Sequence, residues 1–271
     1  MNIVIRLLSH EMASTQMVLL RNLFSLAIVV VWNVGLHRKR PRFPTRRLSG
    51  HFWRASIGIV AMELWFHAVS LLPVTLATAL SFTTPIFSTI IAIIFLRETA
   101  GLRRWGAIAC GFIGVLIILR PGISDISADA LFVIGSSLMM GVAGVLVKTL
   151  TRTEPPETIV FYMSLFMIPW SVPLAILNWQ EPTQHQLWLV FLVALLSTAS
   201  HLCMARAYMR AEMVALMPFD FSRLLFTSAF AYALFGETID LPTIIGSVLI
   251  IASSIYSGKK EVAAKAVVTT M

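Results

Sequence analysis

A series of apolar runs, each about 20 residues long and almost free of charged side chains, dominates this sequence. A helix of that length crosses the ~30 Å hydrocarbon layer of a membrane. Charged residues make up 13% of the chain, where a soluble domain carries roughly 25%. The sequence therefore predicts an all-α polytopic membrane protein. About nine complete spans are expected, at roughly 15–36, 52–72, 74–96, 103–120, 128–150, 157–178, 186–208, 213–235 and 241–257.

Basic residues gather in alternate connections between these runs. The connection 37–47 is rich in Lys and Arg, and the next basic connection contains Arg97, Arg103 and Arg104. The intervening connections carry mostly acidic residues. By the positive-inside rule, the basic connections and the C-terminus are predicted to be cytoplasmic. Membrane topology thus accounts for the net charge of +8, and we expect the lipid bilayer, and no nucleic acid, as a partner.

The two halves of the chain resemble each other at a constant offset. Glu98-Thr99 matches Glu237-Thr238, and the same offset matches Phe82 with Phe221 and Leu102 with Leu241. The two Glu-Thr pairs fall on opposite predicted sides of the membrane, so the repeat is expected to be inverted, as in many secondary transporters. We predict one repeat at 1–124, which lacks most of its first helix, a second repeat at 128–258, and a cytoplasmic tail at 259–271.

A stripe of small and polar residues follows one helical face of each half. Ser81, Thr84 and Ser88 recur at steps of three and four residues. The repeat offset converts them into Asp220, Arg223 and Thr227. Such a stripe can line an aqueous path, or it can allow close helix packing. Ionisable residues inside a span favour the path, although Asp220 and Arg223 are one turn apart and could simply pair with each other.

Two further sites in predicted spans are candidates for binding or proton transfer because they carry ionisable groups. Glu63 and His67 stand four residues apart, where a carboxylate and an imidazole could carry a proton, bind a cationic group, or satisfy each other structurally. His201, with Ser197 nearby, forms a comparable patch that packing could equally explain. Arg21 is expected near a span end, snorkelling to the interface.

Signals for enzymatic or metal chemistry are absent from the sequence. No nucleophile elbow, zinc-protease motif, phosphate loop or dinucleotide fingerprint occurs. Cys110 and Cys203 belong to no ligand-spaced cluster. We therefore expect no enzyme activity, no cofactor and no metal, with a catalytic Glu63–His67 pair as the one enzymatic alternative. Pro85 and Pro218 lie within or beside spans, where they would bend or interrupt the helix.

Three stretches together resemble a known family: ATALSFTTPIFSTIIAIIFLRET, GAIACGFIGVLIILRPG and FDFSRLLFTSAFAYALFGET. They are similar to the EamA family of the drug/metabolite transporter (DMT) superfamily. The resemblance implies a ten-helix fold of two inverted five-helix repeats in the bacterial cytoplasmic membrane. It also implies transport of small organic metabolites, such as amino acids, drugs, or nucleoside- or vitamin-like solutes. The FDFSR stretch is similar to importers of S-adenosylmethionine-like or riboflavin-like compounds.

The expected function is secondary transport of a small-molecule substrate by alternating access around a midplane cavity. The alternative is a non-transporting, truncated membrane component or partner subunit. Substrate identity, direction, coupling ion and oligomeric state, including a homodimer, stay open at this point. The candidate substrate-binding or coupling residues are Glu63, His67, Ser81, Thr84, Ser88, His201, Asp220, Arg223 and Thr227.

Overall fold

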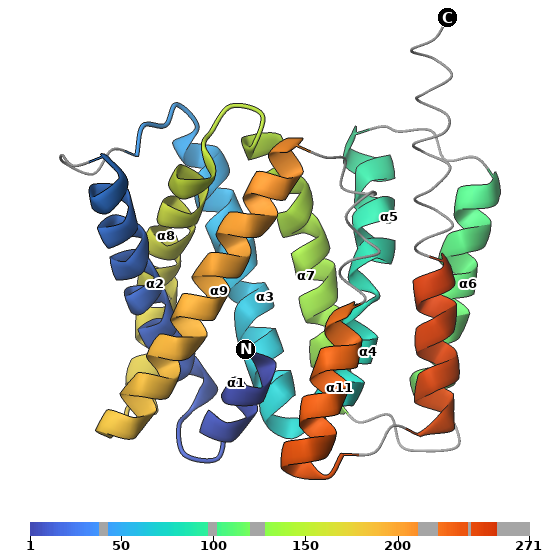
Figure 1. The fold of residues 1–271 in the computed structure, drawn as a ribbon. Coiled ribbons are helices and arrows are strands. Elements are labelled where there is room, and N and C mark those ends of the chain that lie inside the picture. Colours follow the sequence, from blue (N-terminus) through green and yellow to red (C-terminus); the bar gives the residue numbers. More distant parts are fainter. Residues whose placement is uncertain (38–42, 97–101, 120–127, 211–221, 238–239, 254–271) are drawn as a thin grey trace, which may run out of the picture. The chain divides into compact units, whose positions relative to one another are not determined.

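A computed structural model describes residues 1–37, 43–96, 102–119, 128–210, 222–237 and 240–253. Every regular element within these ranges is an α-helix, so the predicted all-α class is confirmed. The predicted tail at 259–271 lies outside the described residues. Figure 1 shows the helices in the order α1 (Asn2–Leu8), α2 (Ser14–His37), α3 (Leu48–Leu71), α4 (Val74–Ser81), α5 (Thr84–Leu96), α6 (Leu102–Leu119), α7 (Ala128–Leu150), α8 (Pro156–Ile176), α9 (Gln184–Arg210) and α11 (Ser222–Phe235).

A further apolar helix follows at Leu241–Ser253. Four helical segments are long and apolar enough to cross a membrane by themselves: Ser14–Gly35, Asp129–Leu150, Pro156–Ile176 and Gln184–Arg210. Their limits agree with the predicted spans to within a few residues. The chain is therefore a multi-span membrane protein built from apolar helices.

The predicted span 74–96 is interrupted. It forms α4 and α5, with Phe82 and Thr83 between them. Pro85 has no N–H to donate to the Ser81 carbonyl in the usual i to i−4 pattern. The Thr84 hydroxyl donates to that carbonyl instead, at 2.7 Å. The interruption agrees with the expectation that Pro85 would bend or interrupt this span.

The described chain divides into two compact units. Unit 1 comprises Met1–Ser70 and Ala143–Arg210, and unit 2 comprises Leu71–Val142 and Ala211–Met271. Each unit combines one segment from each half of the chain. The long helix α7 passes from one unit into the other. The residues of each compact unit therefore differ from those of each predicted sequence repeat. The limits of the repeats remain a prediction.

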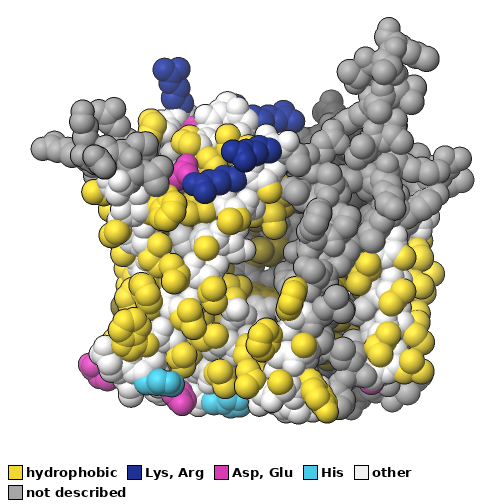
Figure 2. All heavy atoms as spheres, viewed as in Figure 1, with side chains coloured by type: hydrophobic (Ala, Val, Ile, Leu, Met, Phe, Trp, Pro, Cys, Tyr) yellow, Lys and Arg dark blue, Asp and Glu magenta, His cyan; other side chains and the backbone are white. Residues whose placement is uncertain are grey.

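Unit 1 is built around α2, α8 and α9, which pack against one another and lie side by side in Figure 1. Short α1 packs on α9, and Arg6 of α1 donates to the carbonyls of Val69 and Ser70 at the end of α3. This contact satisfies carbonyl groups that a helix end leaves without partners. On the face shown in Figure 2, hydrophobic side chains cover the middle of this unit, as expected for a surface in contact with lipid.

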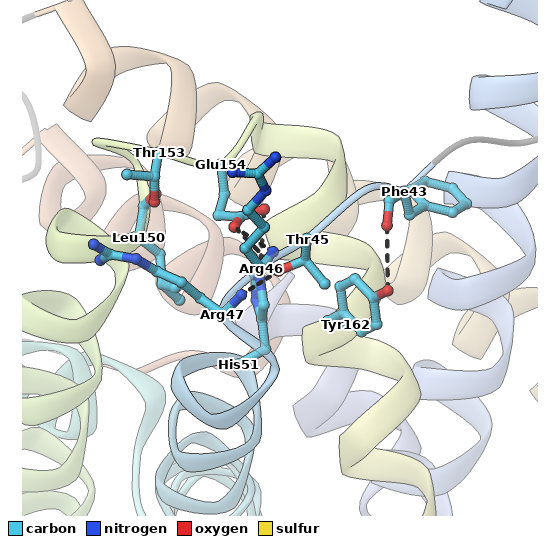
Figure 3. A network of polar contacts seen from close by, with 9 residues as sticks. All are labelled: Phe43, Thr45, Arg46, Arg47, His51, Leu150, Thr153, Glu154 and Tyr162. Atoms are coloured by element: carbon cyan, nitrogen blue, oxygen red, sulfur yellow. Dashed lines mark hydrogen bonds and ion pairs between the residues drawn. The ribbon is translucent and has the colours of Figure 1, made fainter.

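A polar network fixes the start of α3 in unit 1 (Figure 3). Glu154, in the connection after α7, accepts hydrogen bonds from the Thr45 hydroxyl at 3.1 Å and from the Arg46 amide at 3.4 Å. Its other carboxylate oxygen lies 3.9 Å from Nε2 of His51, which is buried. Tyr162 of α8 donates to the Phe43 carbonyl at 3.2 Å. The network joins the α2–α3 connection to the α7–α8 connection.

In unit 2, the carboxylate of Glu237 caps the first residues of α4. Glu237 follows α11 and Gly236, whose φ is +65°, a backbone conformation that glycine adopts without strain. Its two carboxylate oxygens accept the amides of Val74 and Thr75 at 3.0 and 3.1 Å. These are the first residues of α4, where a helix leaves amides unpaired and favours negative charge. The cap complements the packing of α11 on α4.

Glycines allow the other helices of unit 2 to approach closely. A Cβ at Gly114 of α6 would lie 2.7 Å from the carbonyl oxygen of Gly246, and a Cβ at Gly246 would lie 2.5 Å from the carbonyl oxygen of Gly114. The helix at 241–253 therefore crosses α6 with the two backbones in direct contact, as small residues permit inside membranes. Gly106, on the same helix as Gly114, has no heavy atom within 4 Å of its Cβ position.

Candidate functional site

The candidate residues are distributed over both units. Glu63, His67 and His201 belong to unit 1, and Ser81, Thr84, Ser88 and Thr227 belong to unit 2. Asp220 lies outside the described residues. Arg223 belongs to α11, but its side chain is likewise outside what the structure describes. The geometry of each unit is therefore considered separately.

Glu63 and His67 occupy the second half of α3. Glu63 is partly buried, and its Oε1 atom is buried without a hydrogen-bond partner. His67 is exposed, and its carbonyl accepts the Ser70 hydroxyl at 2.7 Å. A carboxylate oxygen without a partner inside an apolar helix is energetically costly and usually functional. Glu63 is therefore the member of this pair with the stronger case for binding or proton transfer.

The hydroxyl stripe of α4 and α5 is satisfied mostly by its own helices. Ser81 donates to the Thr78 carbonyl at 2.7 Å, and Thr84 donates to the Ser81 carbonyl at the same distance. Ser88 is 5% exposed, and its Oγ has no partner. A Cβ at Gly141 of α7 would lie 3.0 Å from the Ser88 amide nitrogen and 3.3 Å from its Oγ. Ser88 thus lies in a tight contact between α5 and α7. Of the two interpretations of the stripe, an aqueous path or close helix packing, this contact favours packing at Ser88.

Of the three candidates in the second stripe, Asp220, Arg223 and Thr227, only the side chain of Thr227 is among the described residues. Thr227 is buried in α11, one turn before Ala231, which is fully buried. Since α11 packs against α4, a small residue at Ala231 suits a close contact between helices.

Arg21 of α2 is an internal residue of unit 1. It is 2% exposed, its Nε donates to the Ser197 hydroxyl of α9 at 3.0 Å, and its Nη1 donates to Asn22 Oδ1 at 2.9 Å. The snorkelling expectation is therefore wrong, because polar partners on α2 and α9 hold the guanidinium inside the unit. His201 is partly buried on α9, within electrostatic range of Arg21 and of a second arginine, Arg54.

Arg54 is the main residue that the sequence analysis missed. It belongs to α3, is 5% exposed, and donates from Nη2 to the Sδ atom of Met163 on α8 at 3.3 Å. The available signal was a charge inside the predicted span 52–72, followed four residues later by Gly58. Unit 1 therefore contains a basic cluster of Arg21, Arg54 and His201 among α2, α3, α8 and α9.

Within the described ranges, no group of three or more His, Cys, Asp or Glu side chains is placed to hold a metal ion. The described polar groups inside the helices include hydroxyls and a few ionisable side chains. Their chemistry suits recognition of a polar solute or movement of a proton.

Comparison with known proteins decides the family. The model of the EamA-like transporter family matches residues 1–120 and 128–258. The chain belongs to the EamA-like transporter family. Both matches together cover most of the sequence, one match in each half, in agreement with the duplication seen in the sequence. The resemblance to this family of the DMT superfamily is thereby confirmed.

EamA-like relatives of this chain are named for two solutes. The riboflavin transporter of Vibrio cholerae is 31% identical over 219 residues, covering 79% of this chain and 72% of the relative. The S-adenosylmethionine uptake transporter of Rickettsia felis is 27% identical over 267 residues, covering 97% and 90%. A crystal structure matches 94% of both chains with a TM-score of 0.66 at 13% identity, which supports the fold alone.

Membership of the EamA-like family gives the buried polar groups a context. The chain is an integral membrane protein of a family that transports small metabolites, and this favours transport over enzyme activity. Ionisable groups inside the helices of such a protein are candidates for solute recognition.

Proposed function

We propose that this protein is a secondary transporter that takes up a polar metabolite of the S-adenosylmethionine or riboflavin type. The main support is the similarity to uptake transporters named for these two solutes, over about four fifths of the chain or more. The proposal includes alternating access between inverted repeats, because the two halves match the same family model. The bacterial cytoplasmic membrane is the proposed location, with the C-terminus in the cytoplasm.

Glu63 is the proposed site of proton coupling. Its buried Oε1 has no partner, so a proton or a cationic group of the solute would satisfy it at little structural cost. Asp220, an acidic residue of the second stripe, is the second candidate. The other candidates, His67, Ser81, Thr84, His201, Arg223 and Thr227, are proposed as contributors to the solute path, whereas Ser88 is proposed as a packing residue at the contact with Gly141.

Uptake into proteoliposomes tests the function and its coupling. Purified protein is reconstituted, and accumulation of radiolabelled S-adenosylmethionine and riboflavin is followed with and without an inward proton gradient. We expect gradient-driven accumulation of at least one solute, lost in Glu63→Gln or Asp220→Asn and retained in the control Glu181→Gln, whose side chain is exposed. Unchanged gradient dependence in both variants would exclude coupling through these groups, and no uptake of either solute would exclude the substrate class.

A further inference from the structure

Arg54 is a buried cation without a carboxylate partner among the described residues, and Tyr208 lies within its electrostatic range. Its Nε and Nη1 atoms are buried without hydrogen-bond partners, and its Nη2 contacts the thioether of Met163, a weak acceptor. The ion pairs His51–Glu154 and Arg206–Glu157 do not involve Arg54. A guanidinium with five N–H donors is therefore mostly unsatisfied within unit 1.

The Arg54 side chain is directed into the unit, away from the polar start of α3. An arginine near a helix end in a membrane normally snorkels toward the interface. Arg54 instead runs along the helix, and its Nη1 occupies the space that a Cβ at Gly58 would fill. The Cε atom of Met167 also borders that space, 2.5 Å from the same Cβ position. The missing side chain at Gly58 thus provides the room that keeps the charge inside.

Arg21 provides an internal comparison. Both arginines are almost fully buried in unit 1, but the Nε of Arg21 bonds to a serine hydroxyl and its Nη1 to an amide oxygen. Arg21 has the contacts of a structural residue that joins α2 to α9. Each guanidinium also contacts one methionine sulfur, Arg21 that of Met62 and Arg54 that of Met163. Arg54 has no other acceptor among the described residues and keeps Nε and Nη1 without partners, which is an arrangement that a ligand oxygen would complete.

An unpaired charge in a membrane interior is costly, so a residue that is only structural gains nothing from it. We propose that Arg54 binds an anionic oxygen group of the transported solute, a carboxylate or a phosphate, through its unpartnered Nε and Nη1 donors. This inference rests on the proposed function and specifies its substrate class. A guanidinium suits such groups because it can donate two parallel hydrogen bonds to their oxygens.

The two solute types differ in this respect. S-Adenosylmethionine carries a carboxylate, whereas riboflavin has no anionic group near neutral pH. Each has a matched counterpart, since decarboxylated S-adenosylmethionine lacks the acid and flavin mononucleotide adds a phosphate to riboflavin. The two pairs therefore distinguish a carboxylate ligand from a phosphate ligand with the rest of the molecule nearly constant.

Binding of these four probes to the full chain in lipid nanodiscs tests the inference. Wild-type protein is expected to bind the acid-bearing member of at least one pair about tenfold or more tightly than its counterpart. This preference should disappear in Arg54→Gln and weaken in Gly58→Ala, which retains the charge but displaces the guanidinium. The matched control Arg152→Gln removes an exposed arginine of the same unit and should keep the preference. Equal preference in wild type and Arg54→Gln overturns the inference.

Thermal unfolding gives a second readout that needs no organic solute. In buffer without oxyanions, Arg54→Met should raise the melting temperature because it removes an unpaired buried charge, whereas Arg21→Met should lower it. Acetate or inorganic phosphate should stabilise wild-type protein and Arg21→Met, but not Arg54→Met. A lower melting temperature in Arg54→Met, or no stabilisation of wild type by either anion, overturns the inference.

The two readouts also distinguish this inference from the proposed function. Failure of wild-type protein to accumulate S-adenosylmethionine or riboflavin contradicts the proposed solutes, while anion-dependent stabilisation through Arg54 would still be measurable. Accumulation that is insensitive to Arg54 supports the proposed function and contradicts the role of Arg54.

Discussion

Units 1 and 2 use polar residues inside their helices in different ways. In unit 1 the buried polar groups include ionisable side chains, and three of them, His51, Arg54 and Glu63, have buried atoms without hydrogen-bond partners. In the described part of unit 2, Ser81 and Thr84 return their hydroxyls to their own backbone, and Glu237 caps a helix. Unit 1 thus leaves atoms of ionisable groups without hydrogen-bond partners, whereas these polar groups of unit 2 bond to their own backbone or cap a helix.

The contrast follows from the cost of leaving a group unsatisfied. A serine or threonine hydroxyl can bond to a carbonyl one turn earlier, so it needs no partner from elsewhere. A guanidinium or carboxylate cannot be satisfied so locally, and its burial is tolerated where a partner, a proton or a ligand completes it. Sequence patterns that treat all polar residues in a span alike miss this distinction.

The largest effect expected in unit 2 comes from its backbone contact. Gly114→Ala would place a methyl group 2.7 Å from the Gly246 carbonyl oxygen, so α6 and the helix at 241–253 must separate. We expect a loss of about 1–3 kcal/mol in unfolding free energy, measured by denaturant titration in detergent micelles. Gly106→Ala on the same helix meets no atom and should be neutral, or stabilising by up to about 1 kcal/mol. Equal effects of the two variants would refute this packing.

An intermediate effect is expected at the carboxylate caps. Glu237→Gln replaces one of two acceptors of the α4 amides by an NH2 group, and should cost about 1–2 kcal/mol. Glu154→Gln in unit 1 should cost less, because the amide it accepts is 3.4 Å away and the Thr45 hydroxyl can rotate. The same denaturant titration compares them, with the exposed Glu181→Gln as control. A larger loss of unfolding free energy in Glu154→Gln than in Glu237→Gln would contradict the expectation that the Glu237 cap is the stronger one.

The smallest effect is expected at Ser88. Its Oγ is buried without a partner, so Ser88→Ala should change stability by less than about 0.5 kcal/mol and leave uptake unchanged. Gly141→Ala, which puts a Cβ 3.0 Å from the Ser88 amide, should destabilise the same contact. Loss of uptake in Ser88→Ala at unchanged stability would place this hydroxyl in the solute path and remove the contrast between the units.

Much of the fold was predictable from the sequence because lipid imposes a simple rule of length and apolarity. The limits of α2, α7 and α8 lie close to those of the predicted spans. Pro85 indicated the interruption between α4 and α5 without fixing its position. The division into units was not predictable, since no sequence pattern reports which halves of two repeats pack together.

The polar residues were predicted less well, because residue type alone does not reveal a side chain's partners. Glu63 lies partly buried in α3, and its position inside the membrane stays a prediction. Arg21 was expected at the interface, whereas Ser197, far away in sequence, holds it inside. Arg54 escaped notice because a charge near the start of a span is usually attributed to the span limit. Its direction depends on the space at Gly58, which only the fold reveals.

Helix α4 is fastened at its start and interrupted at its end. Glu237 accepts hydrogen bonds from its first two amides, while at Phe82 and Thr83 the backbone hydrogen bonds change to the i to i−3 pattern before α5 begins. This eight-residue helix is therefore attached at its first residues to the segment that follows α11, and it can bend relative to α5 at Phe82–Thr83. If the protein changes shape during its working cycle, α4 will travel with α11, and the boundary between moving parts will fall inside a stretch that looks continuous in sequence.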